Sequence, residues 1–239
     1  MKILIMGASS GLGAELVRRY VAAGNTVAAA ARREDRIPPC AATAAIDVDS
    51  PSAPDAINAL IDRLGGLDLY VHVAGIGYAD PALDPAREAQ IAETDAVGFA
   101  RCVSAVFNRM AADRRPARIA AITSVAGTRG TAGMEAYCAS KRFDWTYLQG
   151  LRQRAVNQHL PISITDIRPG WTRTALIDAS KRYPLLMDPE KATAAIMRAI
   201  ARRRKRAVID RRWAVLQFFW SLVPDFIWRH IDPAPFAGD

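Results

Sequence analysis

The stretch that decides the fold lies near the start of the chain and reads Lys2-Ile-Leu-Ile-Met6-Gly7-Ala-Ser-Ser-Gly11-Leu-Gly13. Only apolar residues follow Lys2 up to Met6, which predicts a short buried strand. Residues 14–23 then place apolar side chains at helical spacing before Gly24 ends the pattern. A strand, a glycine-containing turn and a helix in this order can bring backbone N–H groups to a pyrophosphate. An ordinary strand–helix turn has the same pattern, so the rest of the chain must distinguish the two.

Strands and helices alternate along the remaining chain. The expected strands cover residues 26–31, 41–46, 67–73, 119–123, 161–167 and 206–209. The expected helices cover residues 52–64, 85–112, 136–158 and 189–204. This alternation predicts an α/β fold with a Rossmann-like, doubly wound sheet of seven mainly parallel strands and helices on both faces. We expect residues 1–210 to form this single domain.

The composition is that of a globular protein. Of the 239 residues, 51% are hydrophobic and 23% are charged, which excludes an intrinsically disordered chain. The three cysteines, Cys40, Cys102 and Cys138, lie far apart and follow neither a metal-ligand pattern nor a disulfide framework. No run approaches the roughly 20 apolar residues that span a bilayer, and no signal peptide is recognisable. We therefore predict a cytoplasmic protein without a metal site.

The net charge of +8 is concentrated in one segment. Residues 198–212 contain eight lysines and arginines against Asp210 alone, so this segment carries a net +7. The rest of the chain is therefore close to neutral. Because the basicity does not extend over the fold, we predict no nucleic-acid partner.

Residues 211–239 form a tail that is rich in aromatic side chains. Three of the five tryptophans in the chain lie there, Trp213, Trp220 and Trp228. The apolar run 214–223 is too short to span a bilayer, and Pro224 should interrupt its helix. One interpretation is a helix on the surface of an anionic membrane, held by residues 198–231. The alternatives are a lid over an apolar substrate pocket and a contact with a second subunit.

A second stretch supplies groups that can transfer protons, because the predicted strand 119–123 ends at Ser124, where α/β sheets bind ligands. The following helix places Tyr137 and Lys141 four residues apart on one face. A nearby ammonium favours the phenolate over the phenol, whose ordinary pKa is about 10. Ser124 can then hold a substrate oxygen while Tyr137 gives or takes its proton. Alternatively, the pair is a packed tyrosine and a solvated lysine.

The end of the second predicted strand carries Arg32-Arg33. At this position a carboxylate selects the ribose 2′-hydroxyl of NAD, whereas arginine selects the 2′-phosphate of NADP. The nearest acids, Glu34 and Asp35, come later and look like the start of a helix. The two arginines can be mere surface charge, but their position favours NADP.

These motifs together resemble the short-chain dehydrogenase/reductase family over roughly residues 1–210. The resemblance rests on five features in order: Gly7-x-x-x-Gly11-x-Gly13, Asp47-Val48, Ala74-Gly75, Ser124 thirteen residues before Tyr137 with Lys141, and Pro169-Gly170 followed by Thr174. The extended branch of the family, which includes epimerases, has a different glycine spacing and usually a longer chain, so we set it aside.

The resemblance implies a nicotinamide cofactor and a role for each matching residue. Ser124 would orient the substrate oxygen, and Tyr137 would act as the acid or base. Lys141 would hold the ribose hydroxyls and lower the Tyr137 pKa, and Thr174 would meet the carboxamide. The implied cofactor site consists of Gly7, Ser9, Ser10, Gly11, Leu12, Gly13, Arg32, Arg33, Asp47, Val48, Ala74, Gly75, Tyr137, Lys141, Pro169, Gly170, Thr172 and Thr174.

Three positions depart from the family pattern. Met6 replaces the usual threonine of the glycine turn, and His72-Val73 replaces an Asn-Asn pair. We interpret His72 as a structural substitute rather than a general base. Asp95 stands where the family has its catalytic asparagine, so it is the fourth catalytic candidate. Its carboxylate either pairs with Lys141 and raises the Tyr137 pKa, or accepts a backbone N–H and leaves the chemistry untouched.

The sequence predicts two classes of function. The first is an NADP(H)-dependent oxidoreductase that interconverts a carbonyl and an alcohol on a lipophilic substrate. The second is an NADP-binding regulatory or scaffold protein with little turnover, which the departures at His72-Val73 and Asp95 leave open. As in the family, we expect a homodimer or homotetramer paired through residues 85–112 and 137–158, in the cytoplasm or at the inner face of a membrane.

Overall fold

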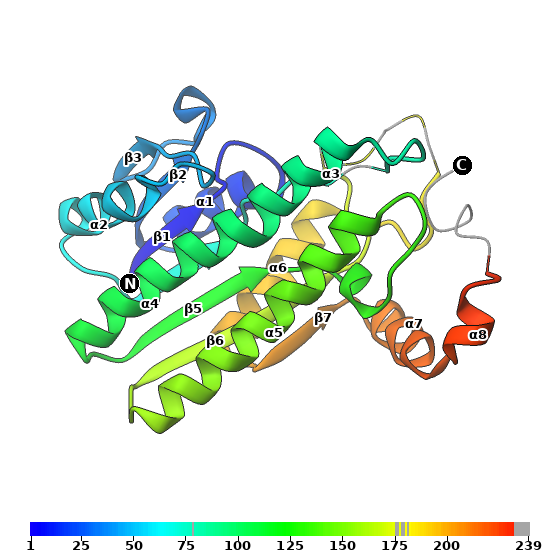
Figure 1. Ribbon diagram of the computed structural model, residues 1–239. Coiled ribbons are helices and arrows are strands. Elements are labelled where there is room, and N and C mark those ends of the chain that lie inside the picture. The colour runs from blue at the N-terminus through cyan, green and yellow to red at the C-terminus, as the bar shows by residue number, and fades with distance from the viewer. Residues whose placement is uncertain (78, 175–176, 178–179, 181, 232–239) are drawn as a thin grey trace.

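The computed structural model describes residues 1–77, 79–174, 177, 180 and 182–231. Within them, seven parallel strands form one sheet in the order β3-β2-β1-β4-β5-β6-β7 (Figure 1). These strands are β1 (Lys2–Met6), β2 (Thr26–Ala31), β3 (Ala42–Ala45), β4 (Leu69–His72), β5 (Ala117–Ile122), β6 (Ile162–Pro169) and β7 (Arg206–Ile209). The order reverses between β1 and β4, which makes the sheet doubly wound. The predicted α/β fold is confirmed.

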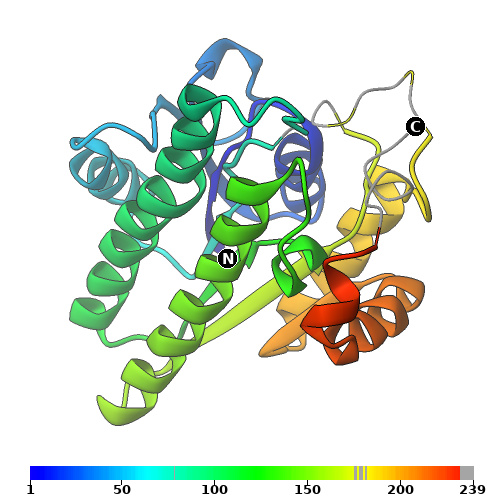
Figure 2. The same ribbon diagram turned by 45° about the vertical axis from the view of Figure 1, so that its right-hand side comes forward.

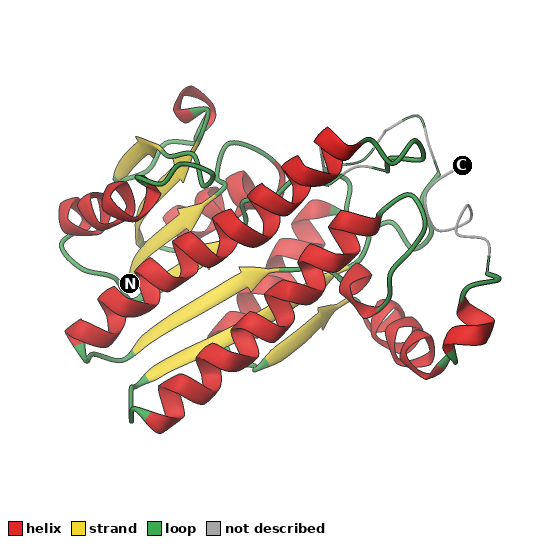
Figure 3. Ribbon diagram, viewed as in Figure 1, coloured by secondary structure: helices red, strands yellow, loops and turns green. Residues whose placement is uncertain are grey.

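Helices cover both faces of the sheet (Figures 1 and 3). One face carries α2 (Ala53–Leu64), α4 (Phe99–Asp113) and α5 (Glu135–Asn157), and the other carries α1 (Gly11–Ala22) and α6 (Pro189–Ala201). The turned view separates α4 and α5 from α6 (Figure 2). Successive side chains of β1 point to opposite faces of the sheet, as in any strand. Leu4 and Met6 pack in the core on the α2, α4 and α5 side, and Ile3 and Ile5 pack in the core on the α1 and α6 side.

The helix predicted over residues 85–112 differs from the structure. It consists of α3 (Pro85–Ala92) and α4, joined by a π-helical turn over Glu93–Gly98. This wider turn buries both Thr94 and Asp95, and Thr94 Oγ1 donates to Asp49 Oδ2 at 2.9 Å. Single π-turns of this kind occur frequently at functional sites. The helical period of the sequence cannot predict the turn, because the turn depends on what these side chains meet in the interior.

The tail folds back on the sheet as α7 (Arg211–Leu222) and α8 (Asp225–Trp228), separated by Pro224. α7 packs against β7 and against the 3₁₀ turn Val125–Thr128; a second 3₁₀ turn spans Glu34–Arg36. Trp213 anchors α7, because it is 1% exposed and its indole N–H donates to the Leu185 carbonyl at 3.2 Å. No helix in the described part of the chain is long and apolar enough to cross a membrane. Residues 232–239 of the tail lie outside the described residues.

Candidate active site

A cleft of about 510 Å³ lies at the carboxyl ends of β1, β4, β5 and β6. Its walls come from the loops that follow these strands, because parallel strands all end at the same edge of the sheet. The cleft brings together the four proton-transfer candidates, Ser124, Tyr137, Lys141 and Asp95, with most of the predicted cofactor site. Two residues of that site, Gly13 and Asp47, are not among the residues that line the cleft.

The glycine turn after β1 allows close backbone contacts. Gly7 has a φ of +89°, and a Cβ there would lie 2.4 Å from the Ala74 backbone nitrogen. A Cβ on Gly13 would lie 2.1 Å from the Gly7 carbonyl oxygen, so Gly13 lets α1 approach β1. The N-cap residue Ser10 places no side-chain hydrogen bond on the first turn of α1. This turn can therefore offer its backbone N–H groups to a pyrophosphate.

Two cations face the cleft at the end of β2. Arg32 and Arg33 both line it, and both side chains are exposed. The nearest acid, Glu34, is engaged with β3, because its carboxylate accepts a hydrogen bond from Thr43 Oγ1 at 2.6 Å. Val48 lines the same end of the cleft. This end can accommodate a ribose with a 2′-phosphate, since arginine binds phosphate by charge-assisted hydrogen bonds.

Ser124, Tyr137 and Lys141 lie together in the cleft. Ser124 follows β5, and its Oγ accepts a hydrogen bond from the Ala126 N–H at 3.1 Å. The same hydroxyl is hydrogen-bonded to the Tyr137 phenol. Lys141 lies one turn further along α5, with Nζ 5.6 Å from the centroid of the Tyr137 ring. A Cβ at Gly77 would lie 2.7 Å from that ring, so Gly77 leaves room for the phenol.

The pKa of the Tyr137 phenol is raised above its ordinary value. Burial raises it most, the Lys141 ammonium and the hydrogen bond from Ser124 lower it, and the Asp95 carboxylate raises it again. Lys141 therefore acts on this pKa in the predicted direction, but burial outweighs it and the net shift is upward. The helical spacing predicts that an ammonium lies near the phenol. It cannot predict the burial of the phenol, which disfavours the phenolate.

Lys141 lies between two buried carboxylates. Its Nζ is 2.7 Å from Asp95 Oδ2 and 3.4 Å from Asp144 Oδ2, and both acidic side chains have no exposed surface. Burial acts to lower the pKa of Lys141, but the two carboxylates raise it overall. Burial raises the pKa of Asp144 to about 8. The Lys141 ammonium lowers this pKa, and repulsion by Asp95 raises it further. The lysine is thus a permanently charged group between two acids that compete for one countercharge.

Asp95 makes both of the contacts that the sequence left as alternatives. Its Oδ1 accepts the Ile76 N–H at 2.7 Å, and its Oδ2 pairs with Lys141. A Cβ at Gly75 would lie 3.2 Å from Oδ1 and 3.4 Å from Lys141 Nζ, so the glycine permits this pairing. Burial raises the pKa of Asp95, and Lys141 and Ile76 lower it.

His72 is a buried structural residue. It has no exposed surface, its Nδ1 is hydrogen-bonded to Tyr70 Oη at 2.8 Å, and its ring meets Phe99 edge-on at 5.0 Å. Burial lowers its pKa to about 3, and Lys141 acts in the same direction. The neutral ring agrees with the interpretation of His72 as a structural substitute. Among the described residues, no group of three or more His, Cys, Asp or Glu is placed to hold a metal ion.

The far end of the cleft follows β6. Pro169, Gly170, Thr172 and Thr174 all line it, and Thr172 Oγ1 donates to the Gly170 carbonyl at 3.2 Å. Thr174 lies against the glycine turn, because a Cβ at Gly11 would be 3.3 Å from its side chain. Apolar groups complete this end of the cleft, among them Ile76, Met134, Trp171, Ile177 and Tyr183.

The sequence profile of the family described as "short chain dehydrogenase" matches residues 1–183. The chain belongs to the short-chain dehydrogenase family. It is 32% identical to an "Uncharacterized oxidoreductase" of Mycobacterium tuberculosis, over 93% of this chain and 94% of the relative. An "Uncharacterized oxidoreductase" of Myxococcus xanthus is 34% identical over 83% of each chain.

Solved structures agree with this assignment to the short-chain dehydrogenases. A short-chain dehydrogenase from Streptomyces avermitilis superposes with a TM-score of 0.76 at 25% identity, over 91% of both chains. One from Burkholderia cenocepacia, in complex with NADP, has a TM-score of 0.81 at 18% identity, over 96% of this chain and 95% of the other. The second likeness establishes the shared fold alone.

Sequence reasoning missed two residues of this short-chain dehydrogenase site. Asp144 follows Lys141 by three residues on α5, and this spacing places the two side chains next to each other. Nothing in the sequence distinguishes Asp144 from a solvated acid. Trp213 supports the cleft from behind: a Cβ at Gly170 would lie 2.2 Å from its indole ring. None of the described tail residues, 211–231, lines the cleft, so the lid interpretation finds no support there.

Proposed function

We propose that this short-chain dehydrogenase is an NADP(H)-dependent oxidoreductase that interconverts a carbonyl and an alcohol, with Tyr137 as the general acid or base. The observation that carries the proposal is the convergence of Ser124, Tyr137 and Lys141 on one cleft with the glycine turn. Backbone N–H groups at Gly11, arginines after β2 and the loop after β6 together fit a nicotinamide dinucleotide. When bound, the cofactor supplies or accepts the hydride.

The residues of the chain perform the proton chemistry. Ser124 orients the substrate oxygen, and Tyr137 donates its proton to that oxygen during reduction. The Lys141 ammonium stabilises the negative charge that develops on the phenol, and Asp95 holds the ammonium in place. Because burial raises the pKa of Tyr137, the phenol is protonated at neutral pH. This favours reduction of a carbonyl, whereas oxidation of an alcohol requires a higher pH.

Arg32 and Arg33 support NADP(H) as the preferred cofactor. Both arginines line the cleft after β2, and Glu34 is held by Thr43 instead of turning to a ribose. Solved structures with this fold were determined with NADP, NADPH or NADH, so their likeness leaves the choice to the residues of this chain.

An apolar substrate suits the far end of the cleft. The rings of Trp171 and Tyr183 lie 4.8 Å apart there, next to Met134 and Ile177. Burial of apolar substrate surface against such walls is favourable, at roughly 25 cal/mol per Å². A lipophilic aldehyde, ketone or alcohol is therefore the proposed substrate class.

The decisive experiment measures NADPH consumption with aldehydes, ketones, quinones, sterols and acyl substrates. We expect turnover that Tyr137→Phe lowers by about 10²- to 10⁴-fold, the usual contribution of a positioned acid, while NADPH binding is retained. NADPH binding without turnover on any substrate would instead favour the regulatory or scaffold protein. Asp95→Asn sharpens the test, because removing this carboxylate should lower the Tyr137 pKa and move the oxidation profile to lower pH.

We also propose that the protein pairs through α4 and α5 into a homodimer or homotetramer. These helices lie side by side on one face of the sheet (Figure 2). Phe143 is 40% exposed on α5, with its ring stacked on Tyr147 at 5.6 Å. Light scattering at micromolar concentration tests this arrangement, and a monomer would contradict it.

A further inference from the structure

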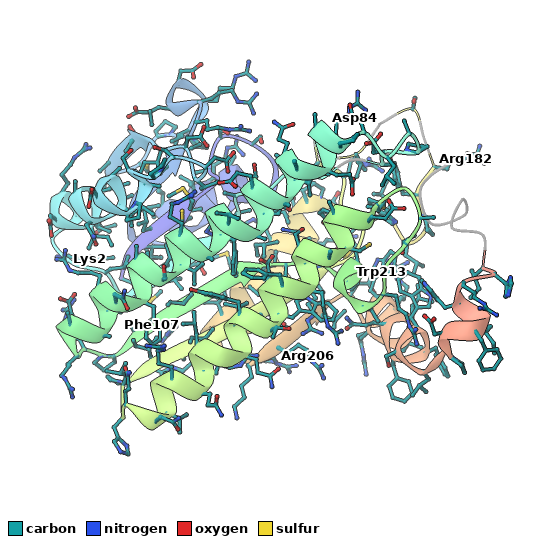
Figure 4. All side chains as sticks on the ribbon, in the orientation of Figure 1. Lys2, Asp84, Phe107, Arg182, Arg206 and Trp213 are labelled. Carbon is teal, nitrogen blue, oxygen red and sulfur yellow. The ribbon has the colours of Figure 1, made fainter. Side chains whose placement is uncertain are left out.

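A second cleft, of about 870 Å³, lies between α5, β7 and α7. It shares no lining residue with the active-site cleft. Arg206 of β7 lines it, and Figure 4 shows this residue beside α5. We call it the basic cleft, because its lining contains six cations and no acid: Arg129, Arg142, Arg152, Arg168, Lys205 and Arg206. Trp145 and hydroxyl and amide groups complete the lining, the latter from Thr128, Thr146, Gln149, Gln217 and Ser221.

The floor of the basic cleft is rigid. Arg168 is 7% exposed, and its guanidinium lies 3.3 Å from the centroid of the Trp145 ring. Its Nη2 and Nε pair with Asp166 Oδ2 at 2.6 and 2.8 Å. Thr123 connects these residues, donating to Asp166 Oδ1 at 2.7 Å and accepting the Trp145 indole N–H at 3.1 Å. This network fixes the position of the arginine before any ligand arrives.

Most of the positive charge in the basic cleft has no counterion. Arg168 pairs with Asp166, and Arg129 lies 3.9 Å from Asp225, but the structure shows no ion pair for the other four cations among the described residues. The Arg152 guanidinium donates instead to the Lys205 carbonyl at 3.2 Å. Burial lowers the pKa of Arg152 and of Arg168, and repulsion by Arg206 lowers both pKa values further. An anion in the cleft would relieve this repulsion.

α7 borders the basic cleft through Gln217 and Ser221, and the residues that follow each of them, Phe218 and Leu222, are exposed. Gln217 Nε2 donates to Thr128 Oγ1 at 2.9 Å, and Ser221 lines the cleft one turn further on. Outside the cleft, α7 and the following α8 expose six large apolar residues, with exposed fractions of 46–63%: Val215, Phe218, Phe219, Leu222, Phe226 and Ile227. We call these six residues the apolar tail face.

The apolar tail face is held in a fixed position relative to the basic cleft. Arg129, which lines the cleft, donates from Nε to the Trp220 carbonyl at 3.1 Å and from Nη2 to the Val223 carbonyl. The Trp228 indole N–H donates to the Gly130 carbonyl at 2.7 Å. The exposed aromatic groups therefore do not belong to a loosely attached tail. They form a surface whose orientation is set by Arg129, which also lines the basic cleft.

We propose that the basic cleft binds the phosphate of anionic phospholipid headgroups, while the apolar tail face enters the boundary between headgroups and acyl chains. Arginine guanidinium groups with hydroxyl and amide donors match phosphate oxygens in charge and hydrogen bonding. A soluble phosphate compound would satisfy the cations but would leave the six apolar residues in water, and an acidic protein would need an apolar surface next to its carboxylates to cover them. A lipid surface satisfies both, as in other peripheral helices. This inference does not rest on the proposed oxidoreductase activity.

Vesicle flotation of the full chain tests the proposal. Vesicles of phosphatidylcholine mixed with phosphatidylserine should carry the protein upward, and vesicles of phosphatidylcholine alone should not. Arg152→Gln with Arg206→Gln should weaken partition roughly 25-fold, since each basic residue near such a surface contributes about fivefold. Phe218→Ser with Phe219→Ser should also weaken flotation, because it removes two of the six apolar residues that would enter the membrane. The matched control is Arg18→Gln with Arg154→Gln, which removes the same charge outside the cleft and should retain flotation.

Three results would overturn the proposal. An equal loss in the control pair would mean that net charge, not the cleft, attracts the membrane. Absence of flotation by the parent protein would exclude the lipid. Calorimetric binding of inorganic phosphate that requires Arg152 and Arg206, without flotation, would identify a site for a soluble anion instead. Thermal unfolding and NADPH binding of every variant show whether the fold is intact, so a failure here is distinguishable from a failure of the proposed activity.

Discussion

The active-site cleft holds Lys141, and the basic cleft its exposed arginines, in opposite ways. In the first, Lys141 is 5% exposed and lies within 3.4 Å of both Asp95 and Asp144. In the second, Arg142 and Arg206 are exposed, and no carboxylate of the described residues pairs with them. A buried charge must be paired within the protein, whereas an exposed charge is solvated until a ligand replaces the water. The first arrangement therefore controls a protonation state, and the second attracts an anion from solution.

The largest expected effect is the loss of the paired cation. Lys141→Met should destabilise the protein by about 3–5 kcal/mol at pH 8, because it leaves buried carboxylates without a countercharge. Arg206→Met, the matched change in the basic cleft, should alter stability by about 0.5 kcal/mol or less, since it removes a solvated charge that repels Arg152. Urea unfolding of both variants measures the difference. Similar losses would mean that the two clefts do not differ in this way.

Arg32→Ala tests a third use of positive charge, an exposed arginine that faces the active-site cleft. Losing one charge-assisted contact to a phosphate costs roughly 1.5–3 kcal/mol. NADPH should bind at least about tenfold more tightly than NADH to the parent protein, and the variant should lose most of this preference. Fluorescence titration with both cofactors measures it, with Arg36→Ala as the control because Arg36 does not line the cleft. Equal affinities of the parent for both cofactors would contradict the proposed preference for NADP(H).

Gly170→Ala tests the connection between the tail and the active site. A Cβ there would lie 2.2 Å from the Trp213 ring, so the overpacking should cost about 1–3 kcal/mol. Gly150→Ala in α5 is the control: a Cβ there meets nothing within 4 Å, and alanine should stabilise the helix by roughly 0.5–1 kcal/mol. Thermal unfolding should therefore shift in opposite directions. Trp213→Leu combined with Gly170→Ala should recover part of the loss; no recovery would show that Trp213 is not the obstacle.

The last expected effect is a gradual pH dependence of stability that comes from Asp144. Its folded pKa of about 8 lies above the ordinary value, so its contribution to stability is complete below about pH 4 and is lost as the pH rises through 8. Asp144→Asn cannot ionise, so its stability relative to the parent should rise with pH by up to about 1.4 kcal/mol per unit. Denaturant unfolding at pH 5.5 to 8.5 measures this trend, with the exposed Asp62→Asn as the control. A parallel trend in both variants would exclude a buried proton on Asp144.

The sequence by itself determined the order of strands and helices and the glycine turn. These features are local: a strand such as β1 is defined by its own apolar residues, and Gly7 by its own backbone conformation. The sequence also indicated that Ser124, Tyr137 and Lys141 meet, because a helix of known period starts shortly after a strand of known direction. Their position in one cleft agrees with that expectation. Their catalytic roles await the kinetic test.

Only the tertiary structure decided the features that depend on burial and on distant parts of the chain. The spacing of Tyr137 and Lys141 indicates attraction, but the desolvation that outweighs it comes from the surrounding fold. Asp144 becomes a partner of the lysine only because packing excludes water from both. The basic cleft combines Arg129 of a loop, Arg152 of α5 and Arg206 of β7. No local pattern joins these residues, since the free energy that holds like charges together comes from the packing of the whole domain.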